Sequence, residues 1–235
     1  MDGGSGVAGQ LNIEFYGYLF GFANLWYTET LRNTWIIGGA MILVALLVRM
    51  NMQKWNPDKP TGVQNAVEAV IEVFHNYVKS IMGEKYAYYG NWYFTVFFLI
   101  LFSNLAGFVL LRNPTADITL TFAFSVTTFA LIHVSGMIRS KKDYFKGFLA
   151  PHPVMLPLNI IGEIAPLISL AMRLFGVVVG GLTVSVLLYN VAPWPARIGF
   201  PVIVHGYFDL FSGLLHAFIF LTLSLVFIKN KLPAD

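Results

Sequence analysis

The stretch EIAPLISLAMRLFGVVVGGLTVSVLLYN, residues Glu163 to Asn190, is apolar almost throughout, yet Arg173 lies near its middle. A guanidinium group keeps its charge at every accessible pH, and burying it in hydrocarbon costs several kcal/mol. The stretch also exceeds the ~20 residues that a helix needs to cross ~30 Å of hydrocarbon. It therefore predicts a membrane helix whose central charge needs an explanation.

The composition of the whole chain also indicates a membrane protein. Of its 235 residues 57% are hydrophobic and 11% charged, and the mean hydropathy is +0.67. The average residue thus prefers lipid to water, and no repeated alternation of lipid-facing and lumen-facing residues indicates a barrel. We expect an all-α, polytopic membrane protein of five to six helices.

Residues 1–235 are expected to form a single membrane domain. Its elements are a first span at about 31–50, an amphipathic surface helix at about 61–83, hairpin spans at about 88–111 and 117–138, and two long, tilted or near-horizontal helices at about 157–190 and 201–229. Most lysines and arginines follow the first, third and last spans, so the positive-inside rule puts the N-terminus outside and the C-terminus in the cytoplasm. Cysteine is absent, which excludes disulfides and thiolate metal sites.

The segment between the first two spans carries charges throughout and cannot itself span. Its apolar residues fall on one helical stripe: Val67, Val70, Ile71, Phe74, Val78 and Ile81. This pattern indicates an amphipathic helix on the cytoplasmic surface. A scaffold that binds lipid headgroups or a partner helix explains it more simply than a catalytic role for His75.

Small residues share the helical face of Arg173. At about 100° per residue, this small-residue lane consists of Gly162, Pro166, Ser169, Gly176, Gly180 and Thr183. One explanation is ordinary helix packing, since Gly176 and Gly180 form a GxxxG pair. Packing alone does not need an arginine, and an arginine alone does not need a smooth lane. Together they favour a surface that another polypeptide passes closely, with a fixed positive charge in its path.

The last helix carries a polar face made by His205, Asp209, Ser212 and His216, at positions i, i+4, i+7 and i+11. Ionisable residues inside a span usually line a water-filled route or a proton relay. His205 and Asp209 also have the spacing of two metal ligands on one helix turn. That alternative is weak, because a closed metal site needs a third or fourth ligand and no further cluster is evident.

Two other acids stand out. Asp117 opens the third span, and its face continues through Thr121, Ser125 and Thr128, so it is either a helix N-cap or the start of a second polar stripe. Glu163 precedes Arg173 by ten residues, which is about 15 Å along a helix, and lies on another face. Direct pairing is thereby excluded, and a separate cytoplasmic-side water access is the natural use of Glu163. His133, roughly opposite the Asp117 stripe, is expected to be a packed or interfacial histidine.

Several of these segments together resemble one known family, the a subunit of the membrane sector of F-type ATP synthases. They occur in order along the chain: TGVQNAVEAVIE, LFSNLAGF, PTADI, LNIIGEIAPLISLAMRLFG and LLHAFIFLTLSLVF. The pair of SLAMRLFG and AFIF is highly specific. Composition and periodicity alone reach only a membrane ion pathway with a buried cation.

The resemblance implies a stator beside a rotating c-ring of small hairpin subunits, within a whole ATP synthase complex that includes b subunits of the peripheral stalk. Arg173 would attract the ionised ring carboxylate and prevent H+ or Na+ from passing straight between two offset half-channels. The resemblance assigns Asp117, Asp209 and His216 to the outer half-channel, and Glu163 with Ser169 to the cytoplasmic one. It also implies a bacterial cytoplasmic (inner) membrane, surrounded by membrane lipid.

The sequence departs from the family pattern at several positions. Many members have Asn in RLFGN and a glutamate nine positions after the arginine, where this chain has Val177 and Leu182. The family often has His where Asp209 lies, Gln where His216 lies, and Asn where Thr119 lies. These departures indicate that one carboxylate has moved from the long helix to the last one, which keeps an acid in the outer pathway.

The alternatives come from other classes. A stand-alone ion channel or secondary transporter would show inverted repeats or broken helices in both halves, and the sequence has neither. A membrane metalloenzyme would bind stoichiometric zinc. No GxxxxGK[ST] loop is present, so ATP chemistry belongs to partner chains and this chain has no catalytic site of its own. We expect no cofactor, no metal and no nucleic-acid partner.

Overall fold

The computed structural model describes residues 15–18, 26–52, 55, 62–109, 111–149, 152–191, 204 and 206–232. Within them lie the α-helices α2 (Glu29–Met52), α3 (Gly62–Met82), α4 (Tyr89–Leu105), α5 (Ile118–Leu149), α6 (Leu156–Val191) and α8 (Gly213–Lys231). Short 3-10 turns are η2 (Glu84–Tyr86), η3 (Ala106–Val109), η4 (Pro114–Ala116) and η5 (Pro153–Met155). The segment η6 (Gly206–Ser212) is a π-helix. Strands β1 (Phe15–Tyr18) and β2 (Trp26–Thr28) form one antiparallel pair.

The predicted class, an all-α polytopic membrane protein, is confirmed, with the short β1–β2 pair as the only strands among the described residues. Four helical segments are long and apolar enough to cross a membrane: Glu29–Met52, Ile118–Arg139, Leu156–Leu188 and Gly206–Lys231. Helix α4 has 17 residues, or about 25 Å at ~1.5 Å per residue. Helix α6 has 36 residues, or about 54 Å, which is far more than a perpendicular crossing needs.

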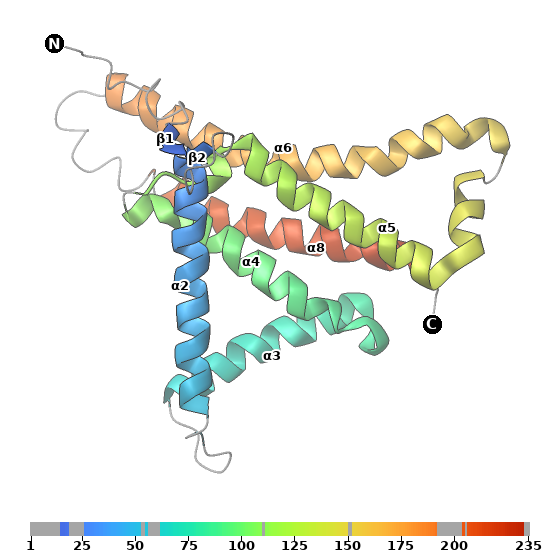
Figure 1. Ribbon diagram of the computed structural model, residues 1–235, viewed down its shortest axis with the longest axis horizontal. Helices are drawn as coiled ribbons and strands as arrows, with labels where there is room; N and C mark the ends of the chain where they lie inside the picture. The colour runs from blue at the N-terminus through green and yellow to red at the C-terminus, as the bar shows by residue number, and fades with distance from the viewer. Residues whose placement is uncertain are drawn as a thin grey trace.

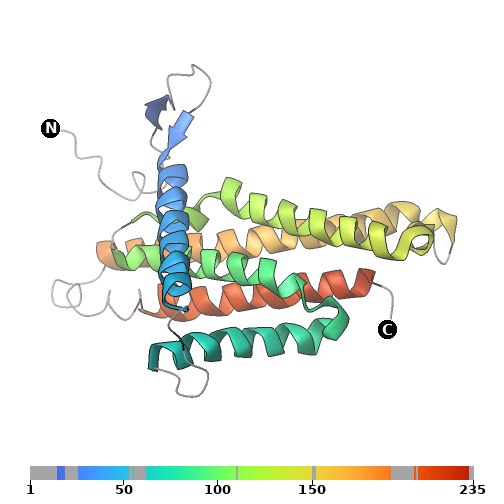
Figure 2. The same ribbon diagram turned by 60° about the horizontal axis from the view of Figure 1, so that its bottom comes forward.

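Helices α3 to α8 run back and forth beside one another, and α2 stands across them (Figures 1 and 2). Helices α6 and α8 cross α2 at a steep angle in both views. If α2 follows the membrane normal, α6 and α8 therefore lie close to the membrane plane. A strong tilt of this kind accommodates the length of α6.

Helix α2 stays largely uncovered by the rest of the chain. Only 6% of its most apolar window is buried, and Ile42, Leu43 and Met50 are among its exposed side chains. Between Asn33 and Val48 this helix carries no charged residue. An uncharged stretch with exposed apolar side chains is suited to lipid or to a partner subunit.

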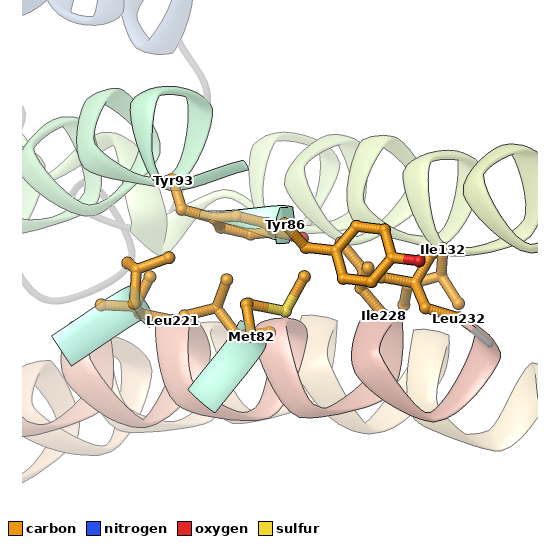
Figure 3. Packing of buried hydrophobic residues seen from close by; sticks show 9 residues of the cluster. Met82, Tyr86, Tyr93, Ile132, Leu221, Ile228 and Leu232 are labelled. Atoms are coloured by element: carbon orange, nitrogen blue, oxygen red, sulfur yellow. The ribbon is translucent and has the colours of Figure 1, made fainter. Parts of the chain in front are cut away.

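The main core lies where α3, α4, α5 and α8 meet (Figure 3). Met82, Tyr86, Tyr93, Ile132, Leu221, Ile228 and Leu232 are all buried there. Phe74 and Ile81 pack against this cluster, so the amphipathic helix α3 docks through the C-terminal half of its apolar stripe. In its N-terminal half Val70 and Ile71 remain about half exposed.

A second core surrounds the middle of α6. It contains Leu170 and Leu174 together with Ile100 of α4 and Phe220 of α8. Polar residues of α5 also face inward, since Thr121, Ser125 and Thr128 are all buried. The Ser125 hydroxyl donates to the Leu167 carbonyl at 2.7 Å, beside the helix-interior Pro166.

Two boundaries differ from the sequence expectation. Helix α5 continues to Leu149, beyond the expected end of this span at about residue 138. Its last turns fold back, because the Tyr144 hydroxyl reaches Nδ1 of His133 and its ring reaches Gly136. The final helix was expected from about residue 201 as a regular α-helix, but its segment Gly206–Ser212 is the π-helical η6.

Candidate functional site

Arg173 is held in α6 between two fully buried leucines, Leu170 and Leu174. Its guanidinium is partly enclosed, and Nη1 is buried with no hydrogen-bond partner among the described atoms. No described carboxylate lies within the 4.0 Å of an ion pair with Arg173. A buried charged nitrogen that lacks a partner is costly, so this site favours an anionic group supplied from outside the described chain.

The small-residue lane is open along the side of α6. Gly162, Ser169, Gly176, Gly180 and Thr183 are all exposed. A methyl group built onto Gly162, Gly176 or Gly180 would meet nothing within 4 Å. The described helices therefore do not use the GxxxG pair for packing within the chain, which leaves the lane accessible to another polypeptide.

The neighbouring Gly181 provides the contrast. A methyl group at this position would lie 3.1 Å from Cβ of Phe208 in η6. One side of α6 is thus packed against η6, while the side that carries Gly180 is open. The distinction shows which glycine serves packing within the chain.

Asp117 is an N-cap in the structure. Its Oδ1 accepts a hydrogen bond of 2.9 Å from the Thr119 backbone N–H at the start of α5. A cap uses one carboxylate oxygen and leaves the other, so capping does not exclude a second role. Asp117 lies in the polar turn between α4 and α5 that also contains η4.

The polar face of the last helix is only partly described. His205 and the side chain of Asp209 lie outside the described residues, although the backbone of Asp209 belongs to η6. His216 places Nδ1 2.8 Å from the Ser212 carbonyl oxygen. Since a carbonyl can only accept, Nδ1 of His216 donates this hydrogen bond, and Nε2 stays available for another contact.

Glu163 does not pair with Arg173 but with Lys231, the last residue of α8. The pair lies at the junction of two cavities. The deep cavity, about 190 Å³, lies between α5, α6 and α8 and is lined in part by Ser125, His133, Glu163, Pro166, Leu170 and Lys231. The shallow cavity, about 460 Å³, is lined in part by Tyr144, Phe148, Asn159, Glu163 and Lys231. The deep cavity has room for several water molecules and polar groups to hold them.

His133 is not merely a packed residue, because it lines the deep cavity together with Glu163. Its Nδ1 is hydrogen-bonded to the Tyr144 hydroxyl, and its buried Nε2 has no partner among the described atoms. Tyr144 lies outside the membrane-spanning segments. Its burial, and to a smaller extent the negative charge of Glu163, raise the pKa of its phenol above the usual value. The phenol therefore stays neutral at neutral pH and remains able to donate.

Sequence reasoning missed Lys231 and the polar contacts of Asn104. The sequence indicated Lys231 only as one of the positive charges that follow the last span. Asn104 accepts from the Thr115 hydroxyl at 2.8 Å and donates to the Gly213 carbonyl at 3.2 Å. A polar residue such as Asn104 within an apolar span is a signal that could have drawn attention to these contacts.

The fold and the site define a polytopic helical membrane protein with charged groups at the centre of its longest helix and in a cavity between three helices. Comparison with known proteins makes the class specific. The family profile described as ATP synthase A chain matches residues 32–229, and the chain belongs to this family. Members are ion-translocating subunits of the membrane sector and not the catalytic subunits.

Curated relatives agree over nearly the whole length. The ATP synthase subunit a of Moorella thermoacetica is 32% identical over 86% of this chain and 89% of its own length. The ATP synthase subunit a of Staphylococcus aureus is 28% identical over 92% of this chain and 95% of its own. A sodium ion specific ATP synthase subunit a from Propionigenium modestum is 29% identical over 94% of this chain and 78% of its own.

Proposed function

We propose that this chain is the stator of a rotary F-type ATP synthase, which offers two offset half-channels to the carboxylates of a c-ring. The observation that carries the proposal is the unpaired, half-buried Arg173 beside an open lane of small residues. The lane lets a ring helix approach closely, and the guanidinium supplies the partner that a ring carboxylate lacks. The translocated ion is H+ or Na+.

Arg173 does two things in this scheme. Opposite charges attract strongly at low dielectric, so a ring carboxylate that arrives at Arg173 releases its ion and is held ionised. The same permanent charge repels a free cation, which therefore cannot pass directly between the half-channels. The ion must instead ride on the ring, and this requirement couples ion flow to rotation.

The outer half-channel contains Asp117, His205, Asp209 and His216 in this proposal. Asp117 caps α5 with one oxygen and retains the other, and His216 uses Nδ1 for the Ser212 carbonyl and keeps Nε2 available. Asp209 belongs to η6, and π-helical segments are frequent at functional sites. The carboxylate of Asp209 would substitute for the acid that many relatives carry where this chain has Leu182.

The cytoplasmic half-channel uses Glu163 and Ser169. The deep cavity supports this assignment, because it leads from Glu163 along α6 to Leu170, one helical turn before Arg173. Ser169 lies on the exposed lane between this cavity and Gly176. Glu163 is ten residues from Arg173, about 15 Å along α6, so an ion that reaches it remains separate from the guanidinium.

The proposed stator role implies particular partner subunits and one orientation in the membrane. The c-ring lies along the small-residue lane, and b subunits of the peripheral stalk hold the chain against rotation. The membrane is the bacterial cytoplasmic membrane, with the N-terminus outside and the C-terminus in the cytoplasm. The lysines within the C-terminal part of α5 and at the end of α8 support this orientation.

The test is ion-driven ATP synthesis by the whole complex in vesicles. Arg173→Ala is expected to abolish coupled synthesis while assembly with the ring persists, and Arg173→Lys is expected to restore little because an ammonium cannot reproduce the guanidinium fork. The control is Lys229→Ala, an exposed cation at the end of α8, which should synthesise ATP normally. Normal coupled synthesis by Arg173→Ala would end the stator proposal.

A further inference from the structure

The ion pair between Glu163 and Lys231 separates the deep cavity from the shallow one. Both side chains line both cavities, and each is 25% exposed. The two residues come from different helices, since Glu163 belongs to α6 and Lys231 ends α8. Gly162 and Asn230 also line both cavities, so the pair lies where the two cavities adjoin.

Aromatic rings hold the ammonium group at this junction. Nζ of Lys231 lies 5.7 Å from the centre of the Phe148 ring and 6.0 Å from that of Tyr144. Both rings belong to the folded-back end of α5, and Asn159 Nδ2 ties that end to α6 by donating to the Phe148 carbonyl at 2.8 Å. A cation over two rings keeps favourable contacts even when it leaves its carboxylate.

The other titratable group that faces the pair from inside is His133, with the Tyr144 hydroxyl hydrogen-bonded to its Nδ1. Neither group supplies a second carboxylate to the deep cavity. Among the residues that line it, Glu163 is the one acid and Lys231 the one lysine or arginine. A cation that enters this space thus meets a carboxylate already occupied by a cation of the chain itself.

We propose that Lys231 is a tethered counter-ion that gates the deep cavity: a translocated cation passes only by displacing the ammonium from Glu163. The ammonium then rests over Tyr144 and Phe148 and returns when the cation has moved on. Lys231 is a positioning residue, because it acts through Glu163. This inference rests on the proposed cytoplasmic half-channel and adds to it the group that controls entry.

Passive ion flux through the membrane sector tests the gate. Vesicles that contain the whole complex stripped of its soluble sector are driven by a potassium diffusion potential, and H+ or Na+ uptake is recorded. Lys231→Met removes the competing cation and is expected to raise the flux about threefold or more, the ratio expected from losing a partly exposed ion pair. Lys231→Arg, which can hold the carboxylate with two parallel hydrogen bonds, is expected to lower it below the wild-type value. Lys229→Met changes an exposed lysine two residues before Lys231, and this control should match the wild type.

A merely structural lysine predicts a different pattern. Loss of packing in Lys231→Met would leave the flux unchanged or lower, and Lys231→Arg would restore it to the wild-type value. Either of these two results overturns the gate. Opposite shifts in the two variants support it.

Thiol labelling separates this inference from the proposed function. Because the chain has no cysteine, Leu167→Cys places a single thiol of this chain in the deep cavity. A water-soluble thiol reagent should label it faster when Lys231→Met is added, and equal rates would overturn the gate. If wild-type vesicles carry no ion while labelling still accelerates, the ion-pathway proposal fails, whereas control of access to the deep cavity by Lys231 is retained.

Discussion

Asn104 and Gly213 are in direct contact between α4 and the first residue of α8. The Asn104 Nδ2 donates to the Gly213 carbonyl at 3.2 Å, and a methyl group on Gly213 would lie 2.9 Å from Cβ of Asn104. The Thr115 hydroxyl donates to Oδ1 of the same amide at 2.8 Å. All three residues are buried, so this contact fixes the junction of η6 and α8 against the turn that precedes Asp117.

Gly213→Ala should therefore destabilise the chain. The added methyl group is too close to Asn104, and overpacking of this kind costs about 1–3 kcal/mol. The measurement is the temperature at which the detergent-solubilised complex loses this subunit. Gly39→Ala in α2 is the matched control, because a methyl group there meets nothing within 4 Å. Equal midpoints for the two variants would show that the contact is more yielding than its geometry indicates.

The adjacent glycines of α6 should separate stability from function. Gly181→Val is expected to lower thermal stability, since its side chain meets Phe208. Gly180→Val faces open space in the described chain and should leave stability unchanged, while a larger side chain in the lane impedes the ring and lowers ion-driven ATP synthesis. Thermal stability and ion-driven ATP synthesis are therefore measured for both variants. Full synthesis by a stable Gly180→Val complex would place the rotor on another face.

Much of the fold could be predicted because it depends on local patterns. Long uncharged runs predict the membrane helices, and the small residues around Arg173 predict an open lane. The Glu163–Lys231 pair could not be predicted, because its members are 68 positions apart and no periodicity connects them. The folded-back end of α5 was missed for a related reason: a basic, polar segment resembles a loop until Tyr144 is seen to reach His133.

The polar face of the last helix shows a different limit. The positions of Asp209, Ser212 and His216 were counted at 100° per residue, which holds for an α-helix. The π-helical η6 has more residues per turn, so that count does not hold through Asp209. Among the described side chains of this face, His216 contacts Ser212 through both the carbonyl and the hydroxyl of the serine.

Asp209→Asn should slow ion transport more than Leu182→Ala does. The amide keeps the size of the side chain but removes the acid, whereas Leu182 has no ionisable group to lose. Passive flux through the reconstituted membrane sector measures both variants against the wild type. Negligible effects of both would count against a relocated carboxylate in the outer half-channel.

The pH dependence of stability at the α3–α4 connection has a definite sign. The hydrogen bond and charge of Lys79, whose Nζ lies 2.7 Å from Glu84 Oε1, lower the pKa of Glu84 below its usual value. A lowered folded-state pKa stabilises the fold above the unfolded pKa, and this contribution disappears as pH falls through the folded pKa. Any difference in thermal midpoint between wild type and Glu84→Gln should thus be present at pH 7 and vanish in acid. Because Glu84 is fully exposed, high salt should also shrink it, and a difference that grows in acid would contradict this assignment.

Asn33 anchors the otherwise exposed α2 to the rest of the chain. Its Nδ2 is fully buried and donates to the Arg112 carbonyl at 2.9 Å, while Glu29 pairs with Arg112 at 3.7 Å. Asn33→Ala leaves that carbonyl without this donor, which costs about 1–3 kcal/mol when the group stays buried. We expect α2 to detach more easily, seen as faster proteolysis at the α2–α3 connection in the purified complex. Ile42→Ala, on the exposed part of the same helix, should leave the cleavage rate unchanged, so equal rates for both variants would show that α2 is held by other contacts.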